Sequence, residues 1–275
     1  MTNSDVLNID YLVSIAKLAA LKAGVEILKV YNSEDFGCKL KSDLSPLTHA
    51  DLAAHNAIHK ILQPSKLPIL SEEGEDVTYQ ERKQWTSFWM IDPLDGTKEF
   101  IKRNDEFTVN IALIQNGKPV IGVVFVPVTN QLYFAHQSIG AFKTDGLTTQ
   151  KLPFIGATSL HDLRVLSSHS YFNHQTKLFL QKLSRPKLVS MGSSLKFLEI
   201  IDNRADVYPR FAPSMEWDSA ASHAICNVVG IEVLNIESQQ PLEYNKESLY
   251  NPFFIVASPP LLDKISVKYL QKDFF

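Results

Sequence analysis

The sequence predicts an α+β protein in which two helices come first and two β-sheets follow one another. Apolar residues recur with a helical period over residues 11–31, with lysines on the opposite side, and a second such segment covers residues 50–62. Short β-rich runs separated by turn residues then fill residues 107–143, and another series begins at residue 163. Helices before a first sheet, followed by a second sheet with helices of its own, indicate a layered arrangement.

The first half of the sequence contains signals for a capped helix and a β-hairpin. Thr48 is a suitable N-cap for the helix over residues 50–62, and the Asn116-Gly117 pair strongly predicts a hairpin. The hairpin strands are expected to belong to one antiparallel sheet with the two runs that follow them. The predicted strands of this half are residues 68–70, 88–91, 107–114, 120–126, 131–135 and 141–143.

The second half alternates strands and helices. Ser193 and Ser194 are expected to cap one helix, and Gly230 is expected to end another. The pattern changes within residues 151–162, so we expect an amino-terminal half of residues 1–155 and a carboxy-terminal half of residues 156–275 in one compact unit. The predicted strands are residues 163–167, 187–189, 207–208, 231–234 and 253–257, and the predicted helices are residues 173–183, 195–202, 218–229 and 261–270.

Composition excludes several classes of protein. A net charge of -3 with no basic cluster argues against a nucleic-acid polymer as partner. No apolar run approaches the ~18 residues that a membrane span needs, and the amino terminus lacks a basic leader segment. Cys38 and Cys226 stand far apart and form no CxxC motif, which argues against a disulfide scaffold and a thiolate zinc site. We expect a cytoplasmic protein, with peripheral attachment to the inner membrane and the choice of monomer or homodimer left open.

Carboxylates follow two of the predicted strands. Asp92 and Asp95 come directly after residues 88–91, in a segment that Pro93 and Gly96 should hold bent. Glu72 follows residues 68–70 in the same way. The carboxyl ends of strands are common ligand sites in open α/β sheets, so these acids are expected to meet there.

Acids gathered in this way repel one another unless a cation compensates them. With Asp218, at the predicted start of a helix, they form an all-oxygen ligand set that suits Mg²⁺ better than zinc. Two such ions ~3.5–4 Å apart activate a water on one side of a phosphoryl group and stabilise the leaving oxygen on the other. The hydroxyl of Thr97 could orient that water, with Asp51 behind it to take the proton.

Each motif also has an ordinary explanation when taken alone. Asp92-Pro93-Leu94-Asp95-Gly96 is a common turn, and Asp218 is a common helix N-cap. His55 and His59 share a helix face with Asp51, which indicates a solvated face more than a metal stripe. Lys196 could be a solvated helix lysine. The three tryptophans are expected to be packing anchors: Trp85, Trp89 and Trp217.

Three strings occur together and in one order: Ser71-Glu72-Glu73, Asp92-Pro93-Leu94-Asp95-Gly96-Thr97 and Trp217-Asp218-Ser219-Ala220-Ala221. They resemble the inositol monophosphatase superfamily of Mg²⁺-dependent, lithium-sensitive phosphatases. Further strings resemble its 3'(2'),5'-bisphosphate nucleotidase (CysQ-type) branch: Lys98-Glu99-Phe100, Gly192-Ser193-Ser194-Leu195-Lys196-Phe197 and Tyr208-Pro209-Arg210-Phe211. The resemblance implies the layered αβαβα sandwich of the inositol monophosphatase and sugar phosphatase fold.

The resemblance also implies a role for each matching position, with two or three Mg²⁺ ions. Glu72 would bind the first ion and the catalytic water, Asp92 would bridge two ions, and the Leu94 carbonyl would complete the first site. Asp95 and Asp218 would hold the second ion. Thr97 with Asp51 would activate the water. The scissile phosphate would lie along Leu94, Asp95, Gly96 and Thr97.

The implied reaction converts adenosine 3',5'-bisphosphate and water into AMP and phosphate, clearing a by-product of sulfate activation, with the related phosphosulfate PAPS as a further substrate. A bisphosphate needs a second anion site, and the candidates are Ser168, His169, Ser193, Lys196 and Arg210. Relatives in this branch often carry arginine before the Ser-His pair. This chain has Ser167 there, which leaves the nucleotide contacts at that edge open.

Two alternatives stay open. An inositol or sugar monophosphatase would use the same metal chemistry without the second anion site. A metal-dependent binding module without turnover would keep the acids, but the presence of both Thr97 and Asp51 argues against it.

Overall fold

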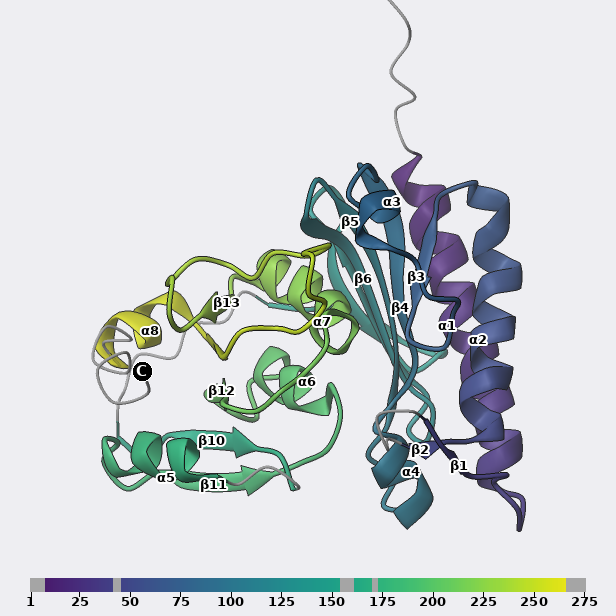
Figure 1. Cartoon of the computed structure of the whole chain (residues 1–275). Coiled ribbons are helices and arrows are strands. Elements are labelled where there is room, and N and C mark those ends of the chain that lie inside the picture. The colour runs from purple at the N-terminus through teal and green to yellow at the C-terminus, as the bar shows by residue number, and fades with distance from the viewer. Residues whose placement is uncertain (1–7, 42–45, 154–160, 170–172, 266–275) are drawn as a thin grey trace, which may run out of the picture.

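Five layers of secondary structure make up the computed structural model, which describes residues 8–41, 46–153, 161–169 and 173–265. Figure 1 shows a helix pair, a large sheet, a second pair of helices, a smaller sheet and an outer helix layer. Three separate clusters of buried apolar side chains fill the spaces between these layers. The predicted αβαβα sandwich is confirmed.

The first layer is the predicted helix pair, α1 (Ile9–Tyr31) and α2 (His49–Leu62). Four alanines of α1 are fully buried, and such small side chains let the helix lie close to its neighbours (Ala16, Ala19, Ala20 and Ala23). Thr48 caps α2 as expected, accepting a hydrogen bond from the amide of Ala50 at 3.2 Å. A short two-stranded ribbon precedes this cap, β1 (Lys39–Leu40) with β2 (Pro46–Leu47), and the 3₁₀ turn Gln63–Ser65 follows α2.

The large sheet contains seven strands in chain order, and only β3 and β4 are parallel. The predicted hairpin is present, with Asn116 and Gly117 at φ 49° and 74° between β5 and β6. The short strand β9 and the one-turn helix α3 (Tyr79–Arg82) were not predicted, because so few residues show no period. The strands are β3 (Ile69–Ser71), β4 (Ser87–Asp95), β5 (Thr108–Gln115), β6 (Lys118–Val126), β7 (Gln131–His136), β8 (Gly140–Thr144) and β9 (Thr149–Lys151).

The middle layer consists of α6 (Leu195–Ile201) and α7 (Glu216–Val229). A side chain at Gly122 of β6 would place its Cβ 2.1 Å from the carbonyl oxygen of Ala221, so α7 can lie against the large sheet only because that residue is glycine. Gly230 ends α7 at φ 75°, as predicted. The helix begins at Glu216 rather than at the predicted Asp218, so Asp218 lies within its first turn.

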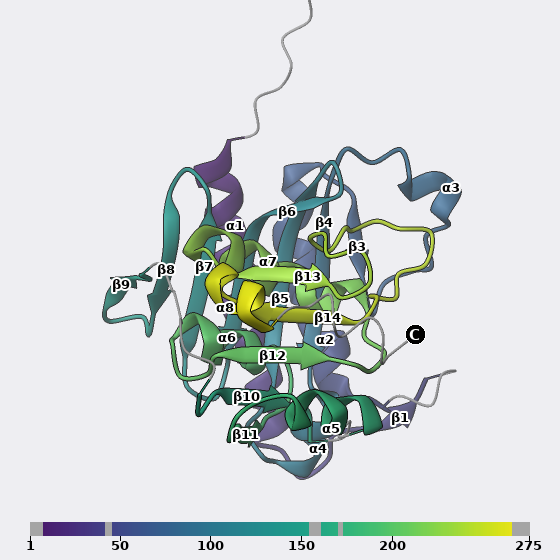
Figure 2. The same ribbon diagram turned by 90° about the vertical axis from the view of Figure 1, so that its left-hand side faces the viewer.

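The smaller sheet has the order β11-β10-β12-β14-β13 and crosses in front of the large sheet in Figure 2. Its outer face is covered by α5 (His174–Gln181) and α8 (Pro259–Ile265), and Phe179 and Leu261 of these helices are fully buried. The strands are β10 (Arg164–Ser167), β11 (Lys187–Ser190), β12 (Val207–Arg210), β13 (Glu232–Asn235) and β14 (Phe254–Ala257).

Two predictions fall wholly or partly outside the described residues. The boundary at 155/156 lies within residues 154–160, so the division into halves stays a prediction. The terminal helix was predicted over residues 261–270, and α8 covers the part of it up to Ile265. No helix within the described part of the chain is long and apolar enough to cross a membrane.

Candidate metal and phosphate site

Three carboxylates converge where the two layers of sheet face each other. One oxygen each of Glu72, Asp92 and Asp218 lies within 4.8 Å of the others. Glu72 follows β3 and Asp92 lies on β4, and these neighbouring parallel strands bring the two acids to the same end of the large sheet. Asp218 comes from the first turn of α7. We call this group the three-acid cluster.

The segment between Asp92 and Asp95 is a bulge within β4, not the terminal turn that was predicted. Asp92 pairs with Asn110 and Asp95 with Thr108 of β5, and the register shifts between them. The bulge bends the strand, and the side chain of Asp92 accepts a hydrogen bond from the amide of Leu94 at 3.1 Å. Gly96 then turns the chain at φ 96° into α4 (Thr97–Lys102), where a Cβ would meet the carbonyl of Glu106 at 2.7 Å.

The cluster concentrates negative charge away from water. Burial, and then the charges of Glu72, Asp95 and Asp218, raise the pKa of Asp92 well above its usual value. Burial and the charges of Asp95 and Glu72 raise the pKa of Asp218 to about 8. An all-carboxylate set that repels itself in this way suits a hard divalent cation, which would favour the ionised forms.

Lys41 supplies a positive charge beside the cluster. Its ammonium forms an ion pair with Glu72 at 2.8 Å and a second one with Glu73. Burial by itself would lower the pKa of Lys41, but these two carboxylates outweigh it and raise that pKa. Lys41 was not singled out from the sequence, because a single lysine in a turn-rich segment gives no pattern, and Glu73 was noted only as part of the Ser71-Glu72-Glu73 string.

These pKa shifts predict the pH dependence of stability without metal. Asp218 has a higher pKa in the folded than in the unfolded chain, so the folded protein binds more protons and is destabilised as pH rises towards 8. Each such proton contributes up to about 1.4 kcal/mol per pH unit. With a chelator present, we expect the melting temperature to fall between pH 6.5 and 8, and to fall less with Mg²⁺. Calorimetry of wild type and Asp218→Asn measures this, and equal slopes for the two chelated proteins would contradict the assignment.

Thr97 and Asp51 are hydrogen-bonded to each other. The Thr97 hydroxyl lies 3.2 Å from Oδ1 of Asp51 and 3.2 Å from the carbonyl oxygen of Leu94. Oδ2 of Asp51 accepts from the amide and hydroxyl of Thr48 at 2.7 and 2.6 Å, which fixes the carboxylate at the start of α2. Because the cap of α2 orients Asp51 towards Thr97, the pairing expected from the sequence has a structural cause.

Asp95 lies beside the cluster, and its Oδ2 is occupied by protein donors. The hydroxyls of Ser193 and Ser194 lie 2.9 and 2.8 Å away, the amide of Ser194 lies 2.6 Å away, and Asn110 lies 3.4 Å away. Ser194 occupies the N-cap position of α6, as predicted, but neither serine caps the helix with its side chain, and both side chains bond to Asp95 instead. The second oxygen of Asp95 is the one that a metal would use.

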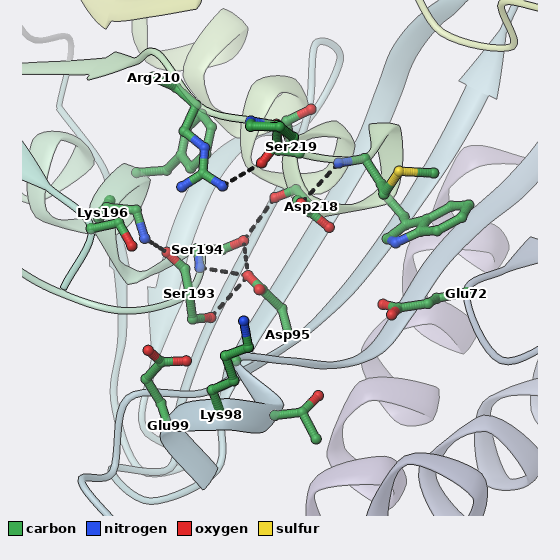
Figure 3. A pocket seen from close by; sticks show the side chains of 18 of the residues that line it. Glu72, Asp95, Lys98, Glu99, Ser193, Ser194, Lys196, Arg210, Asp218 and Ser219 are labelled. Atoms are coloured by element: carbon green, nitrogen blue, oxygen red, sulfur yellow. Dashed lines mark hydrogen bonds between the residues drawn. The ribbon is translucent and has the colours of Figure 1, made fainter. Parts of the chain in front are cut away.

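Beyond the cluster, a pocket of about 560 Å³ extends towards the smaller sheet. Figure 3 shows Lys196 and Arg210 on the side opposite Glu72. Lys196 is 4% exposed, so its interpretation as a solvated lysine is wrong. Its ammonium donates to the carbonyls of Ser193 at 2.5 Å and Met191 at 3.3 Å. Burial and the charge of Arg210 lower the pKa of Lys196 to about 8.

Of the other residues predicted to contact the substrate, some line the pocket and one is directed elsewhere. Ser168 lines the pocket, whereas His169 is directed at Glu106, with Nε2 and Oε2 2.8 Å apart. Arg210 lines the pocket and donates to the carbonyl of Pro213 at 2.6 Å. Sequence reasoning did not assign a role in the site to several other lining residues, among them Glu99 and Tyr250, since neither type stands out by itself.

Other side chains correct the simpler expectations. His55 is not purely solvated, because its Nδ1 lies 2.8 Å from the hydroxyl of Ser71, next to Glu72. Trp89 is fully buried and Trp85 packs against the core, as expected of packing anchors. Trp217 packs against the same core and also lines the pocket, so packing is only part of its contribution.

Comparison with known proteins places this site in a family. The model of the inositol monophosphatase family matches residues 8–271. The chain belongs to this family. The match includes all three acids of the cluster and both Thr97 and Asp51, so the expected family membership is confirmed.

Two relatives of this chain share a more specific name. A protein of Escherichia coli named 3'(2'),5'-bisphosphate nucleotidase CysQ is 41% identical over 243 residues, which cover 86% of this chain and 96% of the relative. A protein of the same name from Haemophilus influenzae is 30% identical over 262 residues, covering 94% and 97%.

Solved structures agree with this. A crystal structure of CysQ from Bacteroides thetaiotaomicron is 44% identical, covers 92% of this chain and 99% of that one, and superposes with a TM-score of 0.82. The protein suhB of Bartonella henselae, at 22% identity and a TM-score of 0.78, shares the fold, covering 95% of this chain and 98% of that one.

Proposed function

We propose that this protein is a Mg²⁺-dependent phosphatase that removes the 3'-phosphate of adenosine 3',5'-bisphosphate to give AMP and phosphate. The observation that carries the proposal is the pocket with two chemically different ends. One end holds the three-acid cluster with Thr97 and Asp51, and the other holds the buried cation of Lys196 beside Arg210. The names of the relatives that are 41% and 44% identical support the same activity.

The metal-binding residues belong to this proposal. Glu72, Asp92 and Asp218 would hold Mg²⁺, completed by the free oxygen of Asp95 and the carbonyl of Leu94. Bound Mg²⁺ supplies charge compensation for the phosphate and a more acidic water. The number of ions, two or three, and the sensitivity to lithium are part of the same expectation.

The chain itself orients the attacking water and takes its proton. The Thr97 hydroxyl, already bonded to Asp51, accepts a hydrogen bond from the water and passes its own proton to Oδ1 of Asp51 as the water loses one. The water oxygen forms the new bond to phosphorus, and the bond from phosphorus to the 3'-oxygen breaks. The 3'-oxygen keeps the electron pair of that bond and takes up a proton from a second water, which gives the 3'-hydroxyl of AMP. Burial raises the pKa of Asp51, which makes its carboxylate a better proton acceptor.

Lys196 and Arg210 would hold the 5'-phosphate. Lys196 gives hydrogens to two carbonyls, and an ammonium has three to give. The hydrogen bonds of the buried Lys196 ammonium go to backbone carbonyls and not to a carboxylate, and a buried cation of this kind favours an anionic ligand over a neutral one. An inositol or sugar monophosphate would leave this end of the pocket without an anion.

Substrate comparison tests the proposal. With Mg²⁺, we expect kcat/KM for adenosine 3',5'-bisphosphate to exceed that for inositol 1-phosphate by about 100-fold or more, the size of one or two charge-assisted hydrogen bonds. Phosphate release from both, and from the phosphosulfate PAPS, is the measurement. Faster hydrolysis of inositol 1-phosphate would favour the monophosphatase alternative, and no release from any of them the non-catalytic binding module.

A cytoplasmic location and a monomeric or homodimeric state are proposed with this function. Peripheral attachment to a membrane has no support in the comparisons.

A further inference from the structure

Glu99 is a buried carboxylate in the wall of the pocket. It lies in the first turn of α4, two residues after Thr97, and is 7% exposed. Figure 3 shows its side chain on the same side of the pocket as Ser193 and Lys196. A Cβ at residue 192 would lie 2.6 Å from Cγ of Glu99, so the absence of a side chain at Gly192 makes room for it.

Its hydrogen-bonding capacity is unused. Within the described part of the chain, no N–H or O–H donor bonds to the Glu99 carboxylate and no cation forms an ion pair with it. The negative charge of Glu99 favours the protonated form of Lys196, but the Lys196 ammonium donates its hydrogen bonds to the carbonyls of Met191 and Ser193. The neighbouring Glu106 is the contrast, since it accepts from the Gly192 amide at 2.7 Å and contacts His169.

Among the described residues, the buried polar side-chain atoms that lack a partner belong to Arg82, Ser222 and Asn251, so the oxygens of Glu99 are open to the pocket. A ligand that fills the pocket displaces the water there, and it leaves this carboxylate unpaired at a cost in free energy unless it supplies a donor itself. A cation is a poor candidate, because the acids that converge among the described residues are those of the three-acid cluster, and Glu99 is not one of them. A phosphate group is excluded by charge. A neutral O–H or N–H donor remains.

We propose that Glu99 accepts a hydrogen bond from the nucleoside part of the substrate and makes the enzyme selective for it. This rests on the proposed function, which places the two phosphates at the two ends of the pocket and the nucleoside between them. Two donors have this chemistry: the ribose 2'-hydroxyl, one carbon from the scissile 3'-phosphate, and the 6-amino group of adenine.

The test combines substrate analogues with variants of Glu99. Wild type, Glu99→Ala and Glu99→Gln are assayed with adenosine 3',5'-bisphosphate, its 2'-deoxy analogue and its inosine analogue, in which oxygen replaces the amino group. We expect wild type to lose about 10- to 100-fold in kcat/KM on the one analogue that lacks the donor, as for hydrogen bonds to charged groups. In Glu99→Ala, kcat/KM for the analogue that lacks the donor should lie within about twofold of kcat/KM for adenosine 3',5'-bisphosphate. The ratio of kcat/KM between the other analogue and adenosine 3',5'-bisphosphate should be the same as in wild type.

Controls separate this effect from damage to the fold. Glu99→Gln keeps the side-chain shape and one acceptor oxygen, so it should fold as wild type and show an intermediate ratio. Glu243→Gln removes a carboxylate from an exposed position and should keep all wild-type ratios.

The outcomes are distinct. Ratios that stay at wild-type values in both Glu99 variants, or equal hydrolysis of all three substrates by wild type, overturn the role of Glu99 while the proposed function stands. Hydrolysis of inositol 1-phosphate with none of the three nucleotides overturns both.

Discussion

Replacing Asp218 by asparagine should abolish most activity while leaving the fold intact. The change removes one charged oxygen from the three-acid cluster, so kcat/KM should fall by more than the ~10–100-fold that residues supporting a metal ligand cost. Asparagine can still accept the hydrogen bond that Oδ2 of Asp218 takes from the amide of Met215 at 2.9 Å, so α7 keeps its start. Phosphate release at saturating Mg²⁺ measures the effect.

The stability of this variant gives a second readout. Asp218 is repelled by Asp95 and Glu72, so the metal-free variant should melt no lower than metal-free wild type at pH 8. Asp263→Asn, an exposed position on α8, is the matched control and should leave rate and melting temperature near wild type. A rate for Asp218→Asn within tenfold of wild type would remove Asp218 from the proposed ligands.

Thr97→Val should lower kcat by about 10²–10⁴-fold with little change in KM, because a general-base interaction acts in the transition state. Valine keeps the shape of threonine but cannot bond to the water or to Asp51. Thr97→Ser restores the hydroxyl and should recover most of the rate. The kcat of Asp51→Asn should be lowered by a similar factor, since asparagine is not a proton acceptor at this position.

The double variant makes this prediction sharper. If Thr97 and Asp51 act as one unit, Thr97→Val with Asp51→Asn should be about as slow as the slower single variant, not the product of the two losses. Steady-state kinetics of the four proteins gives the coupling. Multiplicative losses would show that the 3.2 Å hydrogen bond does not couple them in the reaction. Circular dichroism checks that α2 survives, because Asp51 also bonds to Thr48.

Long, periodic elements were predictable because one residue pattern determines each of them. The helix pair, the hairpin at Asn116-Gly117 and the end of α7 at Gly230 follow from local preferences that the tertiary structure does not oppose. The one-turn helix α3 and the three-residue strand β9 were missed because elements this short contain too few residues to show a helical or strand period.

Part of the candidate site could likewise be predicted from the sequence, and part could not. Asp92, Asp95 and Thr97 stand in one string, so their proximity could be expected from the sequence. The bulge that separates Asp92 from Asp95 is set by pairing with β5, and it is this pairing that leaves Asp92 in the cluster and Asp95 among the serines. A turn and a bulge have the same residue preferences, and only the partner strand decides between them.

The sequence by itself determined the chemistry of this protein, since carboxylates and a hydroxyl at these positions are ligands and proton carriers in any fold that gathers them. The tertiary structure decided which groups are unpaired. Lys196 had two interpretations from the sequence, a contact for a second anion and a solvated lysine, and packing decided between them by burying it beside the pocket. Glu99 stood only within a family string, and its place in the wall of the pocket appears in the tertiary structure alone. Burial and pairing depend on contacts between distant segments, such as Gly192 against Glu99, and no local pattern encodes them.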